Sequence, residues 1–466
     1  MKKIALLFAL SYINHLYADA RSTLTFENNC AESVQFSINA DEAGQSYTVE
    51  LNPNQYVFAG SYVNTNTLEH TTSNIQIQFN SLKHNGRVSY LLNNGFTNNT
   101  ATFTKADGDI EIEHMPLSKD YSYSWHSYTL SGKQEIPSFT VSACKQTYDI
   151  SKSDIADIQR IVIFGDSISD QGNLYHYSAG MIPKSTPYYR GMFSNGAPWS
   201  VLLKNTLKAI NIEVSNYAVG GATVVFEPEW TSLGLPYNLD AELKAYQLDQ
   251  KNWRKDEQKL AIFFIGANDY LTADKSLSDS DIQQISHKVT DKIINAINEA
   301  NAANTLIIGL PDLSFTPESH ERNNEIILSK LTKAHNSQLQ RFASSNAHIK
   351  FIDIDQMFSL LLNDPQKFNA QFNTVIDPEN NALSCWQGGY FKYRYLTTIT
   401  DQHLQLPYQG KFSRDAKANF LVDDSGSLCA DPQHYIFWDH VHPTYQIQKA
   451  IYQYILNDLN IINKHR

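Results

Sequence analysis

The stretch of sequence that decides the fold reads Ile161-Val162-Ile163-Phe164-Gly165-Asp166-Ser167-Ile168-Ser169-Asp170-Gln171-Gly172-Asn173. It opens with a continuously apolar run, which is typical of a strand buried on both faces, as in a helix-covered parallel sheet. The run leads straight into a polar turn that contains Ser167. Because ligand crevices of open α/β sheets lie outside the carboxyl ends of the strands, this serine is placed within reach of a substrate. A serine that only caps a turn or a helix is the alternative interpretation.

Similar apolar runs recur downstream and alternate with amphipathic stretches long enough to be helices. Strands are predicted at 160–164, 213–217, 260–265, 305–308 and 350–354, and helices near 199–209, 282–302 and 321–343. The alternation predicts an α/β domain over residues 151–466 with a five-stranded parallel sheet. The polar, Tyr-rich stretch at about 365–433 breaks this rhythm, so we interpret it as an insertion, either a plain surface excursion or a lid.

The chain before Cys144 has a different pattern. Apolar residues alternate with polar ones in several short segments, as at 34–38, 47–51, 75–79 and 121–125. Such period-two runs, separated by Asn, Asp, Gly and Ser, indicate half-buried antiparallel strands. We therefore predict a small all-β domain, a sandwich or a barrel, over residues 21–150.

Residues 1–20 have the features of a signal peptide. Two lysines precede a short apolar run, and Ala18-Asp19-Ala20 forms a small-residue cleavage site,. The apolar run is too short to anchor the chain in a bilayer. We expect secretion, with a mature chain that begins at Arg21.

Composition narrows the class of protein. Hydrophobic residues make up 42% of the 466 residues and charged residues 18%, which is a globular composition,. The formal net charge of −11 argues against a nucleic-acid partner, whose binding depends on clustered Lys and Arg,. Aromatic residues are plentiful, which is compatible with a lipid ligand without demonstrating one.

Export also changes the interpretation of the four cysteines, because an oxidising compartment favours disulfides over free thiols. Cys30, Cys144, Cys385 and Cys429 allow three pairings. Pairing within each half, Cys30 to Cys144 and Cys385 to Cys429, needs no link between domains. Four free thiols are the alternative.

A serine nucleophile needs a base, and the base needs an acceptor for its other ring nitrogen. The segment 437–443 contains Asp439 and His442, three residues apart, so a single turn of chain can bring the carboxylate beside the imidazole. An ordinary surface turn is the alternative, since Asp and His are common in turns. His434 and His440 compete for the role of base, and we interpret both as structural.

Two further segments, 216–223 and 264–269, offer donors for a tetrahedral intermediate, and each follows a predicted strand. Glycine lets a backbone N–H approach a ligand closely, and an Asn side chain can donate a second hydrogen bond to an oxyanion. Turn formation alone is the alternative for each. The serine is not in a Gly-x-Ser-x-Gly elbow, so the α/β-hydrolase scaffold is not the one used here.

In this order, the four segments resemble the blocks of the GDSL/SGNH hydrolases: Gly-Asp-Ser, a glycine of the second block, Gly-x-Asn-Asp and a late Asp-x-x-His. The resemblance implies a three-layer α/β/α fold and a serine esterase without metal or cofactor. It implies that Ser167 is the nucleophile, His442 the general base and Asp439 its orienting partner. It also implies an oxyanion hole made by the Ser167 amide, Gly221 and Asn268, with Gly220 replacing Gly221 if the alignment shifts by one.

Phe193-Ser194-Asn195-Gly196 followed by Trp199, together with the β-rich amino-terminal region, is similar to a secreted bacterial branch of phospholipases and glycerophospholipid:cholesterol acyltransferases that includes thermolabile haemolysins. This similarity implies phospholipid or lysophospholipid substrates, cholesterol as an acyl acceptor and transient contact with a membrane surface. It further implies that the loop between Cys385 and Cys429 is cut by an activating protease.

Three alternatives stay open at this point. The same site could remove acetyl groups from carbohydrates or other short-chain esters. A metal hydrolase would use Asp166, Asp170, Asp269 and His442 to hold a divalent ion, leaving the serine and asparagine without a role. Finally, the chain could be an adhesin, with a β-domain that binds a cell surface and a relic site.

Overall fold

The structure is a computed structural model, and it describes residues 20–40, 47–53, 56–64, 71–94, 99–104, 106–113, 121–125, 138–144, 148–178, 180, 182–183, 187–225, 238–380, 382–388, 403–405, 413–415, 427–429 and 431–463. The chain divides into two compact units, Met1–Thr147 with Asn463–Arg466, and Tyr148–Ile462. The predicted signal peptide lies outside the described residues except for Ala20. Within the described part of the chain, no helix combines the length and apolarity needed to cross a bilayer.

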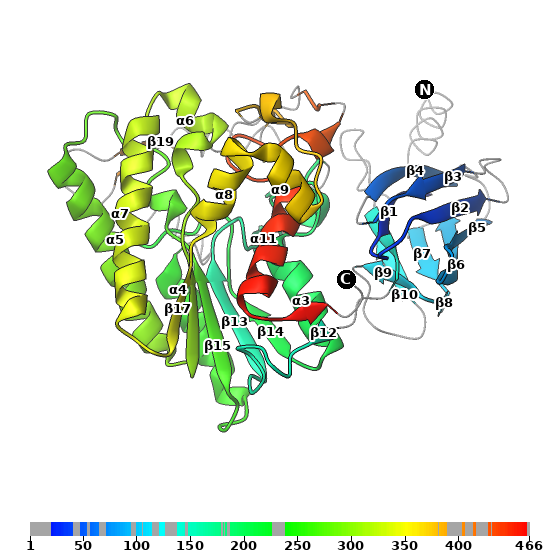
Figure 1. Cartoon of the computed structure of the whole chain (residues 1–466), viewed down its shortest axis with the longest axis horizontal. Helices are drawn as coiled ribbons and strands as arrows, with labels where there is room; N and C mark the ends of the chain where they lie inside the picture. Colours follow the sequence, from blue (N-terminus) through cyan, green and yellow to red (C-terminus); the bar gives the residue numbers. More distant parts are fainter. Residues whose placement is uncertain are drawn as a thin grey trace, which may run out of the picture. The chain divides into compact units, whose positions relative to one another are not determined.

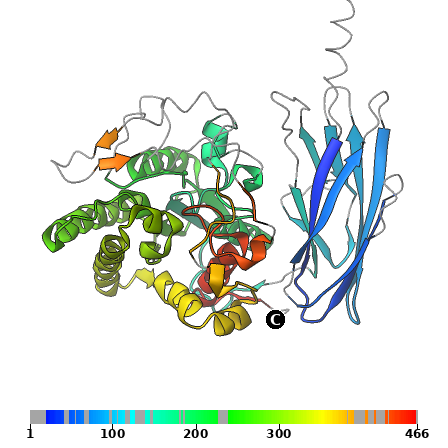
Figure 2. The same ribbon diagram turned by 90° about the horizontal axis from the view of Figure 1, so that it is seen from above.

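The first unit consists of two β-sheets (Figures 1 and 2). One has the order β4-β1-β11-β9, and the other the order β10-β7-β6-β5-β2-β3 with β8 paired to β6. The strands are β1 (Ala20–Asn28), β2 (Val34–Ala40), β3 (Tyr47–Leu51), β4 (Tyr56–Asn64), β5 (Thr71–Asn80), β6 (Asn85–Asn94), β7 (Asn99–Phe103), β8 (Asp107–Gly108), β9 (Ile110–Glu113), β10 (Tyr121–Trp125) and β11 (Ser138–Ala143).

Aromatic side chains from the two sheets of this unit meet in its core. Phe26 of β1 stacks on Phe36 of β2 with ring centroids 4.5 Å apart, and Phe139 of β11 meets Phe103 of β7 edge-on at 5.0 Å. Because the inward faces of two sheets interdigitate, the unit is a β-sandwich, one of the two predicted forms. The predicted disulfide between Cys30 and Cys144 is present beside this core.

The second unit is built on a five-stranded parallel sheet with the order β14-β13-β15-β16-β17. Its strands are β13 (Arg160–Gly165), β14 (Glu213–Asn216), β15 (Lys259–Phe264), β16 (Asn304–Ile308) and β17 (Ile349–Ile352). All five predicted strands are thus confirmed, with ends displaced by at most two residues. This order is that of a doubly wound sheet, whose switch point lies between the first and third strands, here β13 and β15.

Helices cover both faces of this sheet, which makes the predicted three-layer α/β/α arrangement of an SGNH hydrolase (Figures 1 and 2). On one face lie α4 (Leu239–Asp249), α5 (Asp279–Ala300) and α7 (Glu325–Ser344), and on the other α3 (Trp199–Ala209), α8 (Ile354–Asn363) and α11 (Tyr445–Asp458). Shorter elements are α2 (Asn173–Tyr177), α6 (Pro317–Arg322), α9 (Pro365–Phe372), η1 (Tyr189–Gly191), η3 (Gln250–Asn252), η4 (Ala267–Asp269), η5 (Leu313–Phe315), η6 (Pro378–Asn380), η8 (Pro432–His434), β12 (Tyr148–Asp149), β18 (His403–Gln405), β19 (Ser413–Asp415) and β20 (Ile462–Asn463).

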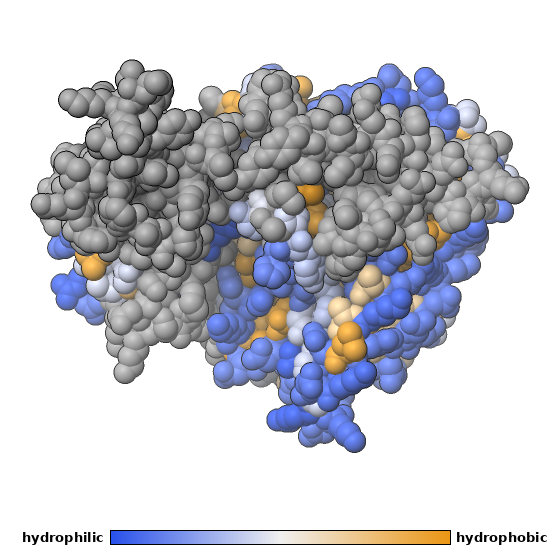
Figure 3. Space-filling model, turned by 180° about the vertical axis from the view of Figure 1, so that it is seen from behind, coloured by the Kyte–Doolittle hydropathy of each residue, from blue (hydrophilic) through white to orange (hydrophobic). Residues whose placement is uncertain are grey.

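The helices are amphipathic because each packs only one side on the sheet. In α5 the buried positions include Ile282, Ile285, Val289 and Ile293, spaced three and four residues apart,. Among the coloured residues of Figure 3, hydrophilic side chains dominate and hydrophobic ones are scattered in small groups. The apolar residues that predicted the helices are therefore largely those that cover the sheet.

Two predicted boundaries were wrong. The helix expected at 321–343 is two helices, α6 and α7, because Asn323 adopts a left-handed conformation (φ 55°) that ends α6,. The insertion expected from about residue 365 begins with regular structure instead. There α9 starts at Pro365, is capped by Asp364, and buries Phe368 and Phe372. Both errors arise from capping residues, whose conformation depends on local hydrogen bonds rather than on the apolar pattern.

Candidate active site

Ser167 lies in the turn that follows β13, at the carboxyl edge of the sheet. Gly165 ends the strand, and a side chain there would collide with the backbone oxygen of Phe264, 2.8 Å from an added Cβ. Only glycine allows this close approach of neighbouring strands. The turn is closed by the Ser169 amide, which donates to the Asp166 carbonyl at 3.0 Å. The local sequence therefore fixes where the serine hydroxyl emerges from the sheet.

The structure brings Ser167, His442 and Asp439 together. Ser167 Oγ lies 2.7 Å from His442 Nε2, and His442 Nδ1 lies 2.7 and 2.9 Å from the two carboxylate oxygens of Asp439. All three residues are buried, with Ser167 the most exposed at 8%. This hydrogen-bonded chain is the arrangement in which an imidazole can take a proton from a serine while a carboxylate holds the ring.

Asp439 is fully buried yet remains the charged member of the chain. One of its oxygens, Oδ1, accepts the backbone N–H groups of Val441 and His442, each at 2.9 Å. The other, Oδ2, accepts the hydroxyl of Tyr188 at 2.7 Å. Burial by itself raises the pKa of this carboxyl, but the imidazole of His442 and the two backbone hydrogen bonds outweigh burial and hold the pKa below its usual value,. A carboxylate stabilised in this way can favour the imidazolium form of the histidine.

The competing histidines are engaged elsewhere. The Asp-x-x-His spacing does not single out His442, because Asp431 precedes His434 by the same interval and its carboxylate lies 3.4 Å from His434 Nδ1. That pair is roughly half exposed, at 41% and 48%. His440 pairs with Glu321, Nδ1 to Oε1 2.8 Å. Of the three histidines, His442 is the one hydrogen-bonded to Ser167.

The two predicted donor segments follow β14 and β15, the strands on either side of β13. Gly221 has φ +77°, and within the described chain no atom beyond its sequence neighbours lies within 4 Å of where a Cβ would be. Gly220 differs, because its N–H is donated to Asp170 Oδ2 at 2.7 Å and a side chain there would strike Phe193. The amide of Gly221 is thus better placed than that of Gly220 to meet a ligand.

Asn268 lies in η4, directly after β15, and is 8% exposed. Its side-chain nitrogen donates to the carbonyl of Ala222, the residue after Gly221, at 2.9 Å. An amide nitrogen carries two hydrogens, so a second hydrogen bond can be made from the same group. The contact also ties the Asn268 turn to the Gly221 loop, and so links the two predicted donors.

Buried carboxyls hold the loops of this edge together. Asp170 accepts N–H groups from Gly172, Asn173, Leu174 and Gly220, and so joins the turn after β13 to the loop after β14. Burial raises the pKa of Asp170 to about 6 and that of Asp166 to about 7. Asp269 accepts the amides of Val224 and Val225 at 2.8 and 2.9 Å.

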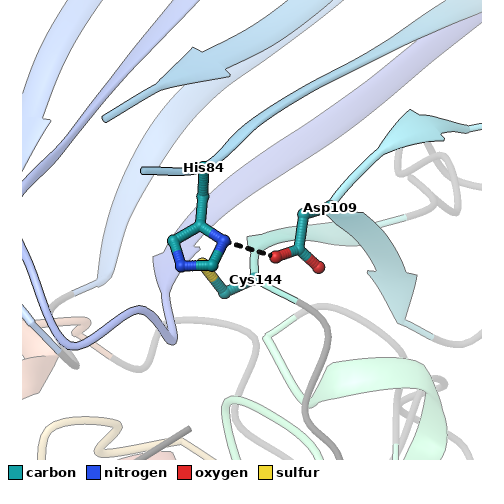
Figure 4. A group of neighbouring side chains, drawn as sticks. All are labelled: His84, Asp109 and Cys144. Atoms are coloured by element: carbon teal, nitrogen blue, oxygen red, sulfur yellow. Dashed lines mark ion pairs between the residues drawn. The ribbon is translucent and has the colours of Figure 1, made fainter. Parts of the chain in front are cut away.

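These contacts argue against the metal-hydrolase alternative. Asp170 and Asp269 use their oxygens for backbone amides, and both ring nitrogens of His442 are used within the Ser167–Asp439 chain. The described residues contain one other group with metal-ligand chemistry, His84, Asp109 and Cys144 in the β-sandwich unit (Figure 4). There His84 pairs with Asp109 at 2.8 Å, and the sulfur of Cys144 is bonded to Cys30. A disulfide sulfur is not a thiolate ligand, so this group is not a metal centre.

The second predicted disulfide, Cys385 to Cys429, is also present and lies next to the histidine loop. The Cys385 amide donates to the carbonyl of Phe437 at 3.1 Å, and the Trp386 amide to that of Trp438 at 2.6 Å. These bonds fix the base of the insertion to the backbone just before Asp439.

Sequence reasoning missed two residues of this edge, Tyr188 and Glu242. Glu242 accepts the Gly165 amide at 3.0 Å, and burial raises its pKa well above the usual value. It had a sequence signal, because it shares the apolar stripe of α4 with Leu239, Leu243 and Tyr246,. Tyr188 had none, because its loop carries no periodic pattern and its partner Asp439 is 251 residues away.

Comparisons with known proteins identify the family of this chain. A family model described as GDSL-like lipase/acylhydrolase matches residues 161–455. The phosphatidylcholine-sterol acyltransferase of Aeromonas hydrophila is 31% identical over 315 residues, which cover 63% of this chain and 87% of that protein. The thermolabile hemolysin of Vibrio parahaemolyticus is 22% identical over 316 residues, 66% of each protein. Among solved structures, the acetyl xylan esterase AlAXEase is 13% identical with a TM-score of 0.32, over 64% of this chain and 99% of that one. Since the family model spans well over half of the sequence, the chain belongs to the family of GDSL-like lipases/acylhydrolases.

Proposed function

We propose that this protein is a secreted serine hydrolase that cleaves acyl esters of phospholipids or lysophospholipids, with water or a sterol such as cholesterol as the acyl acceptor. The observation that carries the proposal is the buried hydrogen-bonded chain from Ser167 through His442 to Asp439. Secretion is supported by the leader-like residues 1–20 and by two disulfides, which persist in oxidising compartments,.

In the proposed reaction, His442 Nε2 takes the proton of Ser167 as Oγ attacks the ester carbonyl. The resulting imidazolium returns its proton to the departing alcohol, which leaves an acyl group on Ser167. Water or an acceptor hydroxyl then gives a proton to His442 and attacks the acyl carbonyl, which releases the acid or a new ester. Asp439 stabilises the imidazolium in both halves and orients its ring.

We assign the oxyanion contacts to the amides of Ser167 and Gly221 and to the side chain of Asn268. Asn268→Ala removes one of these donors from a water-poor site, so we expect kcat to fall by about 10²–10³-fold with little change in KM. Steady-state hydrolysis of a soluble p-nitrophenyl ester measures this. Asn324→Ala, which removes another buried Asn amide that donates to backbone carbonyls, of Leu271 and Ala273, serves as the control. A kcat for Asn268→Ala within a factor of three of wild type would remove Asn268 from the oxyanion hole.

The substrate class rests on similarity to a phosphatidylcholine-sterol acyltransferase and on the family's lipase chemistry. The decisive experiment incubates purified protein with vesicles of phosphatidylcholine and cholesterol and identifies the products by lipid analysis. Free fatty acid with lysophospholipid indicates hydrolysis, and cholesteryl ester indicates transfer. Activity on acetyl esters of carbohydrates but none on vesicles would replace the lipid substrate with the acetylated one. Intact binding to cell surfaces with no ester cleavage would favour an adhesin.

We further propose that the loop closed by Cys385 and Cys429 restrains access to the site until a protease cuts it. The two cysteines are 44 residues apart, and a cross-link over such a loop is worth about 4 kcal/mol in the chain-entropy model,. Most of the enclosed segment lies outside the described residues, but its base is bonded to the Phe437 and Trp438 backbone. A cut inside the loop should therefore leave the histidine loop in place.

Nicking at basic residues of the loop, such as Lys392, Arg394 or Lys411, is expected to raise the rate on phospholipid vesicles severalfold and to speed fluorophosphonate labelling of Ser167. Limited trypsin digestion, followed by non-reducing electrophoresis and activity assays, measures both. A variant with all five basic residues of the loop, Lys392, Arg394, Lys411, Arg414 and Lys417, replaced by Gln controls for cuts elsewhere. If nicked protein stays folded while rate and labelling are unchanged, the disulfide serves stability alone.

A further inference from the structure

The carboxylate of Asp439 has a second side-chain partner besides His442. The hydroxyl of Tyr188 lies 2.7 Å from Asp439 Oδ2, the same oxygen that lies 2.7 Å from His442 Nδ1. Tyr188 is 1% exposed and Asp439 is fully buried. An ionised carboxylate can only accept, so the phenol is the donor of this bond.

The segment that carries Tyr188 also holds the loop with the histidine. The motif singled out in the sequence, Phe193-Ser194-Asn195-Gly196, follows Tyr188 closely. There Ser194 Oγ donates to the carbonyl of Pro443 at 2.9 Å, and Asn195 Oδ1 accepts the amide of Tyr445 at 2.7 Å. The Phe193 ring lies 4.8 Å from the imidazole of His442. These contacts tie the segment just after Tyr188 to the segment just after Asp439, which limits the freedom of the phenol to leave the carboxylate.

We propose that Tyr188 is a positioning residue for the reaction, whose hydroxyl shares the Asp439 carboxylate with His442 and thereby lowers the proton affinity of the catalytic imidazole. The inference rests on the proposed roles of Ser167, His442 and Asp439. A hydrogen bond to a carboxylate stabilises its charge and draws electron density away from the other partner. The imidazolium of His442 is then stabilised less, and more of the histidine stays neutral and able to accept the serine proton at mildly acidic pH.

The other ionisable groups near Asp439 and His442 are the same in wild type and in a Tyr188→Phe variant. Asp166 interacts electrostatically with His442 from the turn after β13. On α6, Glu321 pairs with His440, and Glu318 pairs with Arg322 while its amide bonds the carbonyl of His440. A Tyr188→Phe change removes one oxygen and leaves all of these groups in place, so a difference between the two proteins reports the Tyr188 hydroxyl.

The test compares the pH dependence of kcat/KM for a soluble p-nitrophenyl ester in wild type, Tyr188→Phe and Tyr246→Phe. Tyr246 is the matched control, because it is also fully buried and its hydroxyl donates at 2.9 Å, but to the carbonyl of Ala300. We expect the acid limb of Tyr188→Phe to move to higher pH by about half a unit, a factor of about three in proton affinity. The plateau should fall about threefold to tenfold with KM unchanged, and Tyr246→Phe should retain the wild-type profile.

Titration of the His442 imidazole by NMR separates this inference from the proposed function, because it needs a folded protein and no substrate. The signal is assigned by its loss in His442→Gln. A higher apparent pKa in Tyr188→Phe than in wild type supports the inference even if no ester is turned over. If Tyr188→Phe does not fold, 3-fluorotyrosine at position 188 keeps the ring and makes its hydroxyl a stronger donor. The acid limb and the titration should then move to lower pH. A titration of His442 that is the same with and without the change would overturn the inference.

Discussion

Ser167→Ala is expected to lose ester hydrolysis by on the order of 10⁶ in rate where chemistry limits turnover. The reason is that the Ser167 hydroxyl is the group that lies 2.7 Å from His442 Nε2, and without this nucleophile no acyl-enzyme forms,. The substitution deletes one oxygen from a residue that keeps its backbone turn, so the melting temperature should change by no more than a few degrees. Hydrolysis of a soluble ester, fluorophosphonate labelling and thermal melting measure the three quantities.

The matched control is Ser286→Ala, since Ser286 is a fully buried serine on α5 whose hydroxyl bonds the Gln283 carbonyl, away from the histidine loop. It should keep its activity and its labelling. Activity above a few per cent in a contamination-free Ser167→Ala preparation would exclude this residue as the nucleophile.

His442→Ala should lower the rate of ester hydrolysis as much as the loss of the serine does. Ser167, His442 and Asp439 act as one unit, so removing one member costs nearly as much as removing several. Asp439→Asn should be less damaging, since an amide still fills the site while the charge that favours the imidazolium is gone. Ester hydrolysis under single-turnover conditions measures the two losses separately from product release. The pH dependence of ester hydrolysis adds a second readout. Asp439 has a depressed pKa and remains ionised at neutral pH, so Asp439→Asn removes a charge that wild type carries there.

The other two histidines supply the controls. His440→Ala breaks a pair with Glu321, and His434→Ala a half-exposed pair with Asp431, so both variants should keep most of their activity. A larger loss for His440→Ala or His434→Ala than for His442→Ala would show that the base has been assigned to the wrong residue.

Much of the fold of the second unit, Tyr148–Ile462, was predictable because the sequence patterns of strands and helices are local. The apolar runs that became β13 to β17 need only their own residues to be recognised, and their alternation with helices implies a parallel sheet,. The errors fall at Asn323 and at Asp364, where a backbone conformation or a cap, not hydrophobicity, sets the end of a helix. Likewise the β-sandwich was distinguished from a barrel only in the structure, where the strands pair into two separate sheets and rings from both, such as Phe26 and Phe36, meet in the core.

The residues of the active site likewise fall into those that local sequence patterns identify and those that only tertiary packing identifies. The serine could be identified from sequence because it follows a buried strand, and strand ends define one edge of the sheet. The Asp-x-x-His spacing by itself could not identify the histidine, because Asp431 and His434 have the same spacing as Asp439 and His442; only the family resemblance implied His442. Packing decided it, by burying one pair against Ser167 and leaving the other half exposed. Packing also separated Gly221 from Gly220, whose amide Asp170 already uses.

By itself, then, the sequence determined the parallel sheet, the serine at its edge and the family, and it left three cysteine pairings open. Tertiary structure brought the imidazole that the resemblance had implied to that serine, and it alone revealed that Tyr188 shares the carboxylate behind it. The physical reason is that a buried hydrogen bond depends on distance and direction between atoms, and residues 251 positions apart acquire these only when the chain has packed,.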